Sequence, residues 1–235
     1  QNSSVSFINT NVMRNGDFRD ANVSALLFDL YTKGNTYNLF GDFKYSTINE
    51  FGHYNGFKTQ LNFRKTRGKY RYMFAGKYIS KDYDVNDLGL IFYTNYHNIY
   101  ANGSYRIVNP TKTFNTFRIN EYANFEIENT TGKLQTGAIG TEIKATTLKN
   151  NYLEFILEVT PFKTFDFYRD FGRINVFIPE KVYSVFNFTT NDNHPFTIAV
   201  QPQFTKYNQS GRANYGFALS PKYRFNDKIS IYYLL

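Results

Sequence analysis

Hydrophobic and polar residues alternate one by one along much of the chain, most strictly in residues 56–80. In residues 57–64, uncharged and mostly apolar side chains take the odd positions, and Lys, Gln, Asn and Arg take the even ones. After a turn at residues 65–68, Tyr, Phe and Gly take the even positions of residues 70–78. Successive side chains leave a β-strand on opposite sides, so the pattern predicts a hairpin with one aromatic face and one polar face.

Segments of the same kind recur through the sequence. The predicted strands occupy residues 4–10, 21–31, 36–47, 54–65, 69–80, 88–95, 99–108, 114–128, 133–146, 151–160, 182–190, 196–206, 214–225 and 229–235. Many have about ten residues, whereas strands in soluble domains average about five or six. About ten tilted residues span the hydrocarbon layer of a bilayer. Residues 161–181 break the pattern and predict either a further short strand or a structured connection.

Connections of two kinds separate the predicted strands. Those that begin near residues 33, 65, 129 and 225 are short and polar, and those near residues 11 and 80 are long. Short turns at one end and long loops at the other are typical of outer-membrane barrels.

Composition narrows the fold class. Aromatic residues make up 20% of the chain, as 25 Phe and 21 Tyr without Trp, yet the mean hydropathy is -0.49. This combination favours a sheet with one face in lipid and one in water. The chain has no cysteine, which excludes disulfides and thiolate metal sites. It also has no apolar run long enough for a transmembrane helix, so only a closed barrel of its strands would cross a membrane.

The sequence therefore predicts an all-β fold, an antiparallel transmembrane β-barrel of the outer-membrane type with about 14 or more strands. We expect residues 1–235 to form a single domain in the outer membrane of a Gram-negative bacterium. The final "KISIYYLL" stops inside a predicted strand. This indicates an incomplete part of a larger barrel, truncated at both ends, and a chain that begins downstream of any signal peptide.

Three blocks resemble a known family: residues 6–30, 83–114 and 160–190, with Asn-Thr-Asn-Val at 9–12, Arg-Asp-Ala-Asn at 19–22, Asn-Asp-Leu-Gly at 86–89 and Gly-Arg at 172–173. The family is a group of Bacteroidota outer-membrane proteins of unknown function. Its members carry an N-terminal domain like the family-nine carbohydrate-binding modules, followed by a long β-barrel region. The resemblance covers most of residues 5–190 and implies that this chain is part of the barrel region only. It supplies no catalytic residues.

The two faces of the predicted strands define the candidate site residues. The lipid-facing aromatic candidates are Phe57, Phe63, Tyr70, Tyr72, Phe74, Tyr78, Tyr215, Phe217, Tyr223 and Phe225. The lumen-facing basic candidates are Lys44, Lys58, Arg64, Arg71, Lys77, Lys222 and Arg224.

A net charge of +8 gives the basic candidates two interpretations. A basic lumen concentrates anionic solutes, whereas the simpler alternative is that these residues solvate the lumen or pair with loop carboxylates such as Asp17, Asp20 and Glu50. Arg14 and Arg19 are candidates to meet lipopolysaccharide phosphates. The expected partners are outer-membrane lipid, lipopolysaccharide and other outer-membrane proteins, and no nucleic acid is expected.

Catalytic or metal chemistry is not expected. His53, His97 and His194 stand alone, and no nucleophile motif is present, so the sequence predicts neither an enzyme nor a cofactor. Asp82, Asp84 and Asp87 form a weak candidate Ca²⁺ site. The segment lacks the glycine and closing glutamate of an EF-hand loop, which favours a solvated acidic loop without metal.

Three functions follow from the sequence. The first is an integral outer-membrane barrel for passage or docking of a solute, such as a glycan or an anion. The second is a structural or partner subunit, or a client, of a larger outer-membrane assembly. Within the first function, the barrel portion of a TonB-dependent transporter is the alternative. The third function is that of a soluble aromatic-rich β protein that binds ligands.

Overall fold

The computed structural model describes residues 3–16, 18–87, 89–167 and 176–235. Its regular elements within these ranges are fifteen β-strands. The strands are β1 (Ser4–Val12), β2 (Asp20–Tyr31), β3 (Tyr37–Asn49), β4 (His53–Lys65), β5 (Tyr70–Ile79), β6 (Tyr96–Ile107), β7 (Phe114–Glu128), β8 (Leu134–Thr147), β9 (Tyr152–Thr160), β10 (Thr164–Asp166), β11 (Val176–Ile178), β12 (Lys181–Thr189), β13 (Phe196–Tyr207), β14 (Ala213–Arg224) and β15 (Ser230–Tyr232). The all-β prediction is confirmed.

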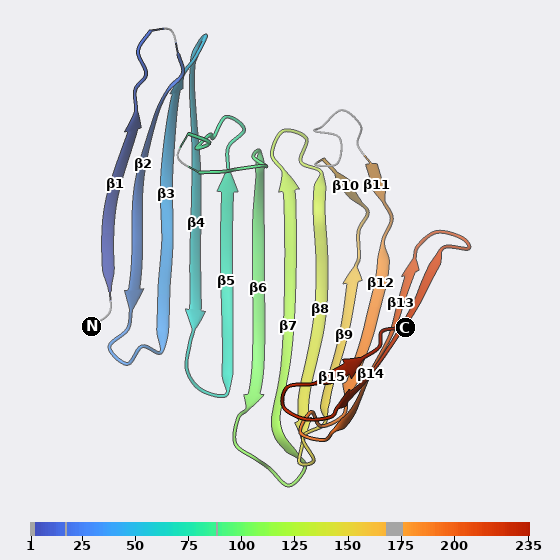
Figure 1. The fold of residues 1–235 in the computed structure, drawn as a ribbon. Helices are drawn as coiled ribbons and strands as arrows, with labels where there is room; N and C mark the ends of the chain where they lie inside the picture. Colours follow the sequence, from blue (N-terminus) through green and yellow to red (C-terminus); the bar gives the residue numbers. More distant parts are fainter. Residues whose placement is uncertain (1–2, 17, 88, 168–175) are drawn as a thin grey trace. The chain divides into compact units, whose positions relative to one another are not determined.

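The strands follow one another in the sheet almost as they do in the chain (Figure 1). A 13-stranded sheet has the hydrogen-bonded order β1-β2-β3-β4-β5-β6-β7-β8-β9-β12-β13-β14-β15, and β10 and β11 form a separate 2-stranded sheet. In this order β1 and β15 each have a single neighbour, so the sheet of the described strands is not closed into a barrel. The small β10–β11 sheet matches the predicted short strand within residues 161–181; residues 168–175 of that range lie outside the described part.

Most predicted strands are present within a few residues, with one clear exception. The strand predicted at residues 88–95 is wrong, because residues 89–95 form no strand, and residue 88 lies outside the described ranges. The position of the turn at residues 129–132 also differs from the prediction. The pattern of connections predicts the short turns at one end of the sheet and the long loops at the other. The Asn129 N–H donates to the carbonyl of Asn95, 2.9 Å away, which places this short turn beside the long β5–β6 connection.

The chain packs into two compact units. Unit 1 comprises residues 1–101, 124–137 and 164–177, and unit 2 comprises residues 102–123, 138–163 and 178–235. The prediction of a single domain stays a prediction, and the two units are described separately. The described part of the chain contains no helix with the length and apolarity needed to cross a bilayer.

In unit 1 the aromatic face is the exposed one. Along β3, Leu39, Phe43 and Tyr45 remain 36%, 45% and 40% exposed, whereas Asn38 and Ser46 of the opposite face are 1% and 0% exposed. The strand register carries this division across the sheet, because side chains of directly paired residues share a face. Phe63 of β4 pairs with Phe74 of β5. Unit 1 is therefore built with polar side chains buried and rings exposed, the reverse of an ordinary soluble sheet.

Unit 2 has long antiparallel strands of the same type. Along β14, Tyr215 and Phe217 are 80% and 64% exposed. On β8 and β9, Lys144 and Glu154 are directly paired, and the lysine Nζ lies 3.0 Å from the Glu154 carboxylate and 2.7 Å from that of Glu142. Lys144 is therefore neutralised by one carboxylate of its own strand and one of the neighbouring strand.

Candidate functional site

Residues 80–95 form the connection between β5 and β6 (Figure 1). The described part of this segment contacts the polar face of β3 and β4 in unit 1. The described residues of this 80–95 segment are 80–87 and 89–95. Ser46 and Gly56 form a directly paired position beneath it. The Asp84 N–H donates to the Ser46 hydroxyl at 3.1 Å, and a Cβ added to Gly56 would lie only 2.2 Å from the Tyr83 nitrogen. The two small residues make room for the backbone of the segment.

A small hydrophobic cluster explains why this segment is not a strand. Tyr83 packs with Ile79 and Tyr96, all less than 10% exposed, and Val85 and Ile91 pack against them. Ile91, from the segment predicted as a strand, thus packs against this cluster, whereas Leu90, Phe92 and Tyr93 remain exposed. Burial raises the pKa of Tyr83 to about 12, and the negative charge of Asp42 adds to this increase.

Ion pairs hold the segment from the side of the β1–β2 connection. The Arg19 guanidinium lies 2.6 Å from the Asp87 carboxylate, 2.8 Å from that of Asp84 and 3.3 Å from that of Glu50. Arg14 lies 2.8 Å from Asp87, whose side chain is 8% exposed. The hydrogen bond from Arg19 is the main reason that the pKa of Asp87 lies below its ordinary value, and the hydrogen bond to Asp87 likewise raises the pKa of Arg19.

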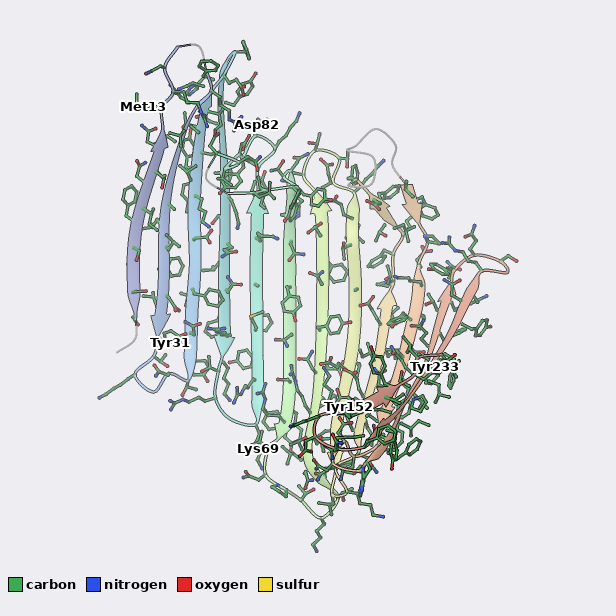
Figure 2. All side chains as sticks on the ribbon, in the orientation of Figure 1. Met13, Tyr31, Lys69, Asp82, Tyr152 and Tyr233 are labelled. Carbon is green, nitrogen blue, oxygen red and sulfur yellow. The ribbon has the colours of Figure 1, made fainter. Side chains whose placement is uncertain are left out.

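These ion pairs change the interpretation of the acidic run at residues 82–87. Asp84 and Asp87 neutralise arginines, while Asp82 is exposed. Among the described residues, no group of three or more His, Asp or Glu side chains is arranged to hold a metal ion. Figure 2 shows Asp82 at the same end of unit 1 as Met13 of the β1–β2 connection, with Tyr31 and Lys69 at the other end.

Hydrogen bonds hold the segment from the β7–β8 turn as well. The Asn129 side chain donates to the Ile79 carbonyl at 2.9 Å, and the Asn95 side chain donates to Thr130 at 2.8 Å and also to the Glu128 carboxylate. His97 lies 2.8 Å from Asn129 through its ring Nδ1. Contacts from both flanks therefore fix the position of the 80–95 segment.

Two cavities lie against this segment and share Tyr83, Ile91 and Phe92 as wall residues. The first has a volume of about 530 Å³ and is lined by the carboxylates of Glu50, Asp82 and Asp84 together with Arg19 and Lys81. The second, which we name the lysine cavity, has a volume of about 330 Å³. It is lined by Lys44, Lys58, Lys77, Ile79, Tyr83, Val85, Leu90, Ile91, Phe92, Tyr93 and Tyr96.

The lysine cavity brings together three of the seven predicted basic residues. Lys44 lies 3.7 Å from Asp42, and Lys77 donates to the Tyr96 hydroxyl at 2.9 Å. Lys77 also lies 4.7 Å from the centre of the Tyr96 ring. The charges that act on the Lys58 side chain are those of Lys44 and Lys77, which repel it, and that of Asp42, which attracts it.

The other four predicted basic residues lie elsewhere. Arg64 donates to the Asn38 side chain at 2.7 Å, and Arg71 donates to the carbonyl of Gly68 in the β4–β5 turn at 3.2 Å. In unit 2, Arg224 donates to the carbonyl of Asn193 at 3.1 Å, and Lys222 is exposed.

The predicted aromatic face is exposed in both units. The exposed fractions are 36% for Phe57, 38% for Phe63, 66% for Tyr70, 56% for Phe74, 36% for Tyr78, 80% for Tyr215, 64% for Phe217, 46% for Tyr223 and 59% for Phe225, while Tyr72 is partly buried. Neighbouring rings contact one another across strands, as Phe57 and Tyr78 do at 5.3 Å between ring centres.

Several residues that build the site were not predicted from the sequence. In the sequence, Ser46 and Gly56 are recognisable only as small residues on a polar face, and nothing distinguishes Tyr96 from the other tyrosines. The pairing of Arg19 with Asp84 and Asp87 joins positions more than sixty residues apart, and the clustering of arginines in one long connection and aspartates in another was its only sequence signal.

The fold and site define an all-β protein with one large antiparallel sheet and a basic cavity on its polar face. The chain belongs to the family described as a domain of unknown function (DUF5916), which matches residues 1–235. No curated protein matches this chain at a significant level.

Proposed function

We propose that this chain is the membrane-embedded part of an outer-membrane β-barrel protein that admits or docks an anionic solute on its polar face. The proposal rests on the exposure of the two faces of the sheet: apolar side chains are exposed and polar side chains are buried, the reverse of a soluble sheet. Leu61 and Phe74 on the outer face of β4 and β5 are 53% and 56% exposed, while Asn38 and Asp42 on the opposite face of β3 are 1% and 6% exposed. Lipid favours exposed rings and aliphatic side chains that water would drive inside.

Strand length supports the same proposal. Strands β2 to β8 have between 10 and 15 residues, which suits a tilted crossing of a hydrocarbon layer that needs about 9–11 residues. The resemblance of the sequence to a Bacteroidota family of outer-membrane barrels agrees with this, and it makes a carbohydrate-binding module a candidate neighbour of the barrel.

The proposal requires partners for the two edges of the sheet. An unpaired backbone group in lipid costs several kcal/mol, so an open edge does not persist there. In the strand order, β1 and β15 each have one neighbour. The assembled protein must therefore supply further strands that pair with β1 and β15, or join these two strands, to close the barrel.

Single-cysteine labelling of the intact protein tests the orientation of the sheet, since this chain has no cysteine of its own. Phe74→Cys and Ala75→Cys, each labelled with a fluorophore, place the label on opposite faces of β5. Each labelled protein is reconstituted in vesicles that contain nitroxide-labelled lipid. We expect the lipid nitroxide to quench the label at residue 74 and aqueous iodide to quench the label at residue 75. Leu61→Cys and Gln60→Cys repeat the comparison on β4. Equal iodide quenching within both pairs would exclude the membrane-embedded orientation.

A further inference from the structure

We propose that the lysine cavity binds a small organic anion that carries a carboxylate, phosphate or sulfate group on a ring-sized apolar body. This proposal rests on the proposed function for its biological setting. It adds the chemical class of the solute and the place where the solute binds. The site itself is built from residues of unit 1 alone: Lys44, Lys58 and Lys77 from three adjacent strands, and the wall provided by the 80–95 segment.

The first step of the argument is the excess of positive charge. None of the described residues that line the lysine cavity is acidic. Asp42 is the carboxylate within electrostatic reach of Lys58, but it lies 3.7 Å from Lys44 and also accepts a hydrogen bond from Gln60 at 2.7 Å. One carboxylate thus faces three ammonium groups. An anion with one or two negative charges would balance the remaining positive charge.

The second step is that sheet stability does not explain these lysines. Lys44 and Lys58 are directly opposite each other in the antiparallel register, and like charges in that position repel each other and destabilise the pairing. Three carboxylates of the neighbouring connections are engaged elsewhere. Glu50, Asp84 and Asp87 all pair with Arg19.

The third step is the shape and chemistry of the opposite wall. Tyr83 and Tyr96 are 3% and 9% exposed, and Ile91 and Phe92 complete an apolar surface beside the ammonium groups. A volume of about 330 Å³ lies at the lower end of the range for small-molecule sites and accommodates one ring rather than a polymer. The cavity therefore favours an anion with an apolar body over inorganic phosphate alone.

Phenyl phosphate is a suitable probe, with inorganic phosphate and neutral benzyl alcohol as controls, measured by calorimetry on the intact purified protein. We expect phenyl phosphate to bind more tightly than inorganic phosphate and benzyl alcohol not to bind. Lys58→Gln should weaken the binding of phenyl phosphate by about tenfold, because one charge-assisted contact is lost. Lys69→Gln, an equal change of net charge in the β4–β5 turn, should leave binding unchanged. Unaltered binding in a Lys44→Gln, Lys58→Gln, Lys77→Gln triple variant would overturn the proposal.

Acetylation of the unmodified protein gives a second test that no misfolded variant can confuse. Bound phenyl phosphate should protect Lys44, Lys58 and Lys77 from a lysine-acetylating reagent while Lys69 and Lys222 react as before; equal modification with and without the probe would refute the site. The lipid-quenching experiment on the same preparation separates the two proposals. If the rings face lipid but phenyl phosphate protects none of the three lysines, the anion site is rejected and the membrane function is retained. If phenyl phosphate protects the lysines but the rings do not face lipid, the membrane function is rejected and the anion site is retained.

Discussion

Basic residues lie on the polar face of β4 in unit 1 and of β14 in unit 2, yet the two regions differ in what these residues do. In unit 1, Lys58 shares a cavity with Lys44 and Lys77. In unit 2, Lys222 is exposed, and Arg224 bonds to a backbone carbonyl. Both strands expose rings on the other face. The difference is the 80–95 segment, which covers the polar face in unit 1, so a covering segment rather than the alternation itself creates the candidate site.

The largest effect is expected when a side chain fills the space that the 80–95 segment occupies. Gly56→Val introduces a Cβ that would meet the backbone of Tyr83 at 2.2–2.3 Å, so we expect displacement of the segment and a loss of about 3 kcal/mol in the free energy of unfolding. Gly76→Val on β5 is the matched control, since nothing lies within 4 Å of a Cβ there. Urea unfolding and tryptic cleavage after Lys81 provide the measurements. Equal stability and equal cleavage of the two variants would contradict the contact between the 80–95 segment and Gly56.

Loss of the ion pairs should have a smaller effect. Arg19→Gln leaves Asp87, whose side chain is 8% exposed, with Arg14 as its remaining cation, and we expect destabilisation by about 2 kcal/mol. Faster cleavage after Lys81 should accompany the loss. Arg67→Gln in the exposed β4–β5 turn removes the same charge and serves as the control. If both variants behave alike, the ion pairs do not hold the segment.

Acid should release the segment only at low pH. The pKa of Asp87 lies below its ordinary value because Arg19 and Arg14 favour the carboxylate, so its stabilising contribution is complete above the unfolded pKa of about 3.9 and is lost as the pH falls through the lower folded pKa. A fluorophore on Asp82→Cys should therefore keep its spectrum from neutral pH down to about pH 4 and change below it. A change between pH 5 and 7 would show that another group controls the segment.

The smallest effect is expected in unit 2. Lys222→Gln removes an exposed charge and should change the free energy of unfolding by less than about 0.5 kcal/mol. Binding of phenyl phosphate should also stay the same, which distinguishes a defined cavity from a general attraction of anions to basic strands. A weakening comparable to that of Lys58→Gln would remove the distinction between the two regions.

The sequence predicted the strands well because alternation is a local property that each strand carries by itself. It predicted the faces for the same reason, and the pairing of Phe63 with Phe74 confirms that the two aromatic faces of the 56–80 hairpin coincide. It failed at residues 89–95, which form no strand and where Ile91 packs on the cluster of Ile79, Tyr83 and Tyr96. The site depends on contacts between distant positions, such as Ser46 with Asp84, and periodicity contains no information about them.

The attachment of the 80–95 segment on both flanks has a consequence for the order of folding. Asn95 bonds to the turn that follows β7, so the segment reaches its final position only after two further strands have been made and joined. Contacts that distant along the chain form late. During biogenesis the 80–95 segment would therefore settle on β3 and β4 only after β6 and β7 have joined the sheet, and a chain interrupted before β7 would leave this part of the polar face uncovered.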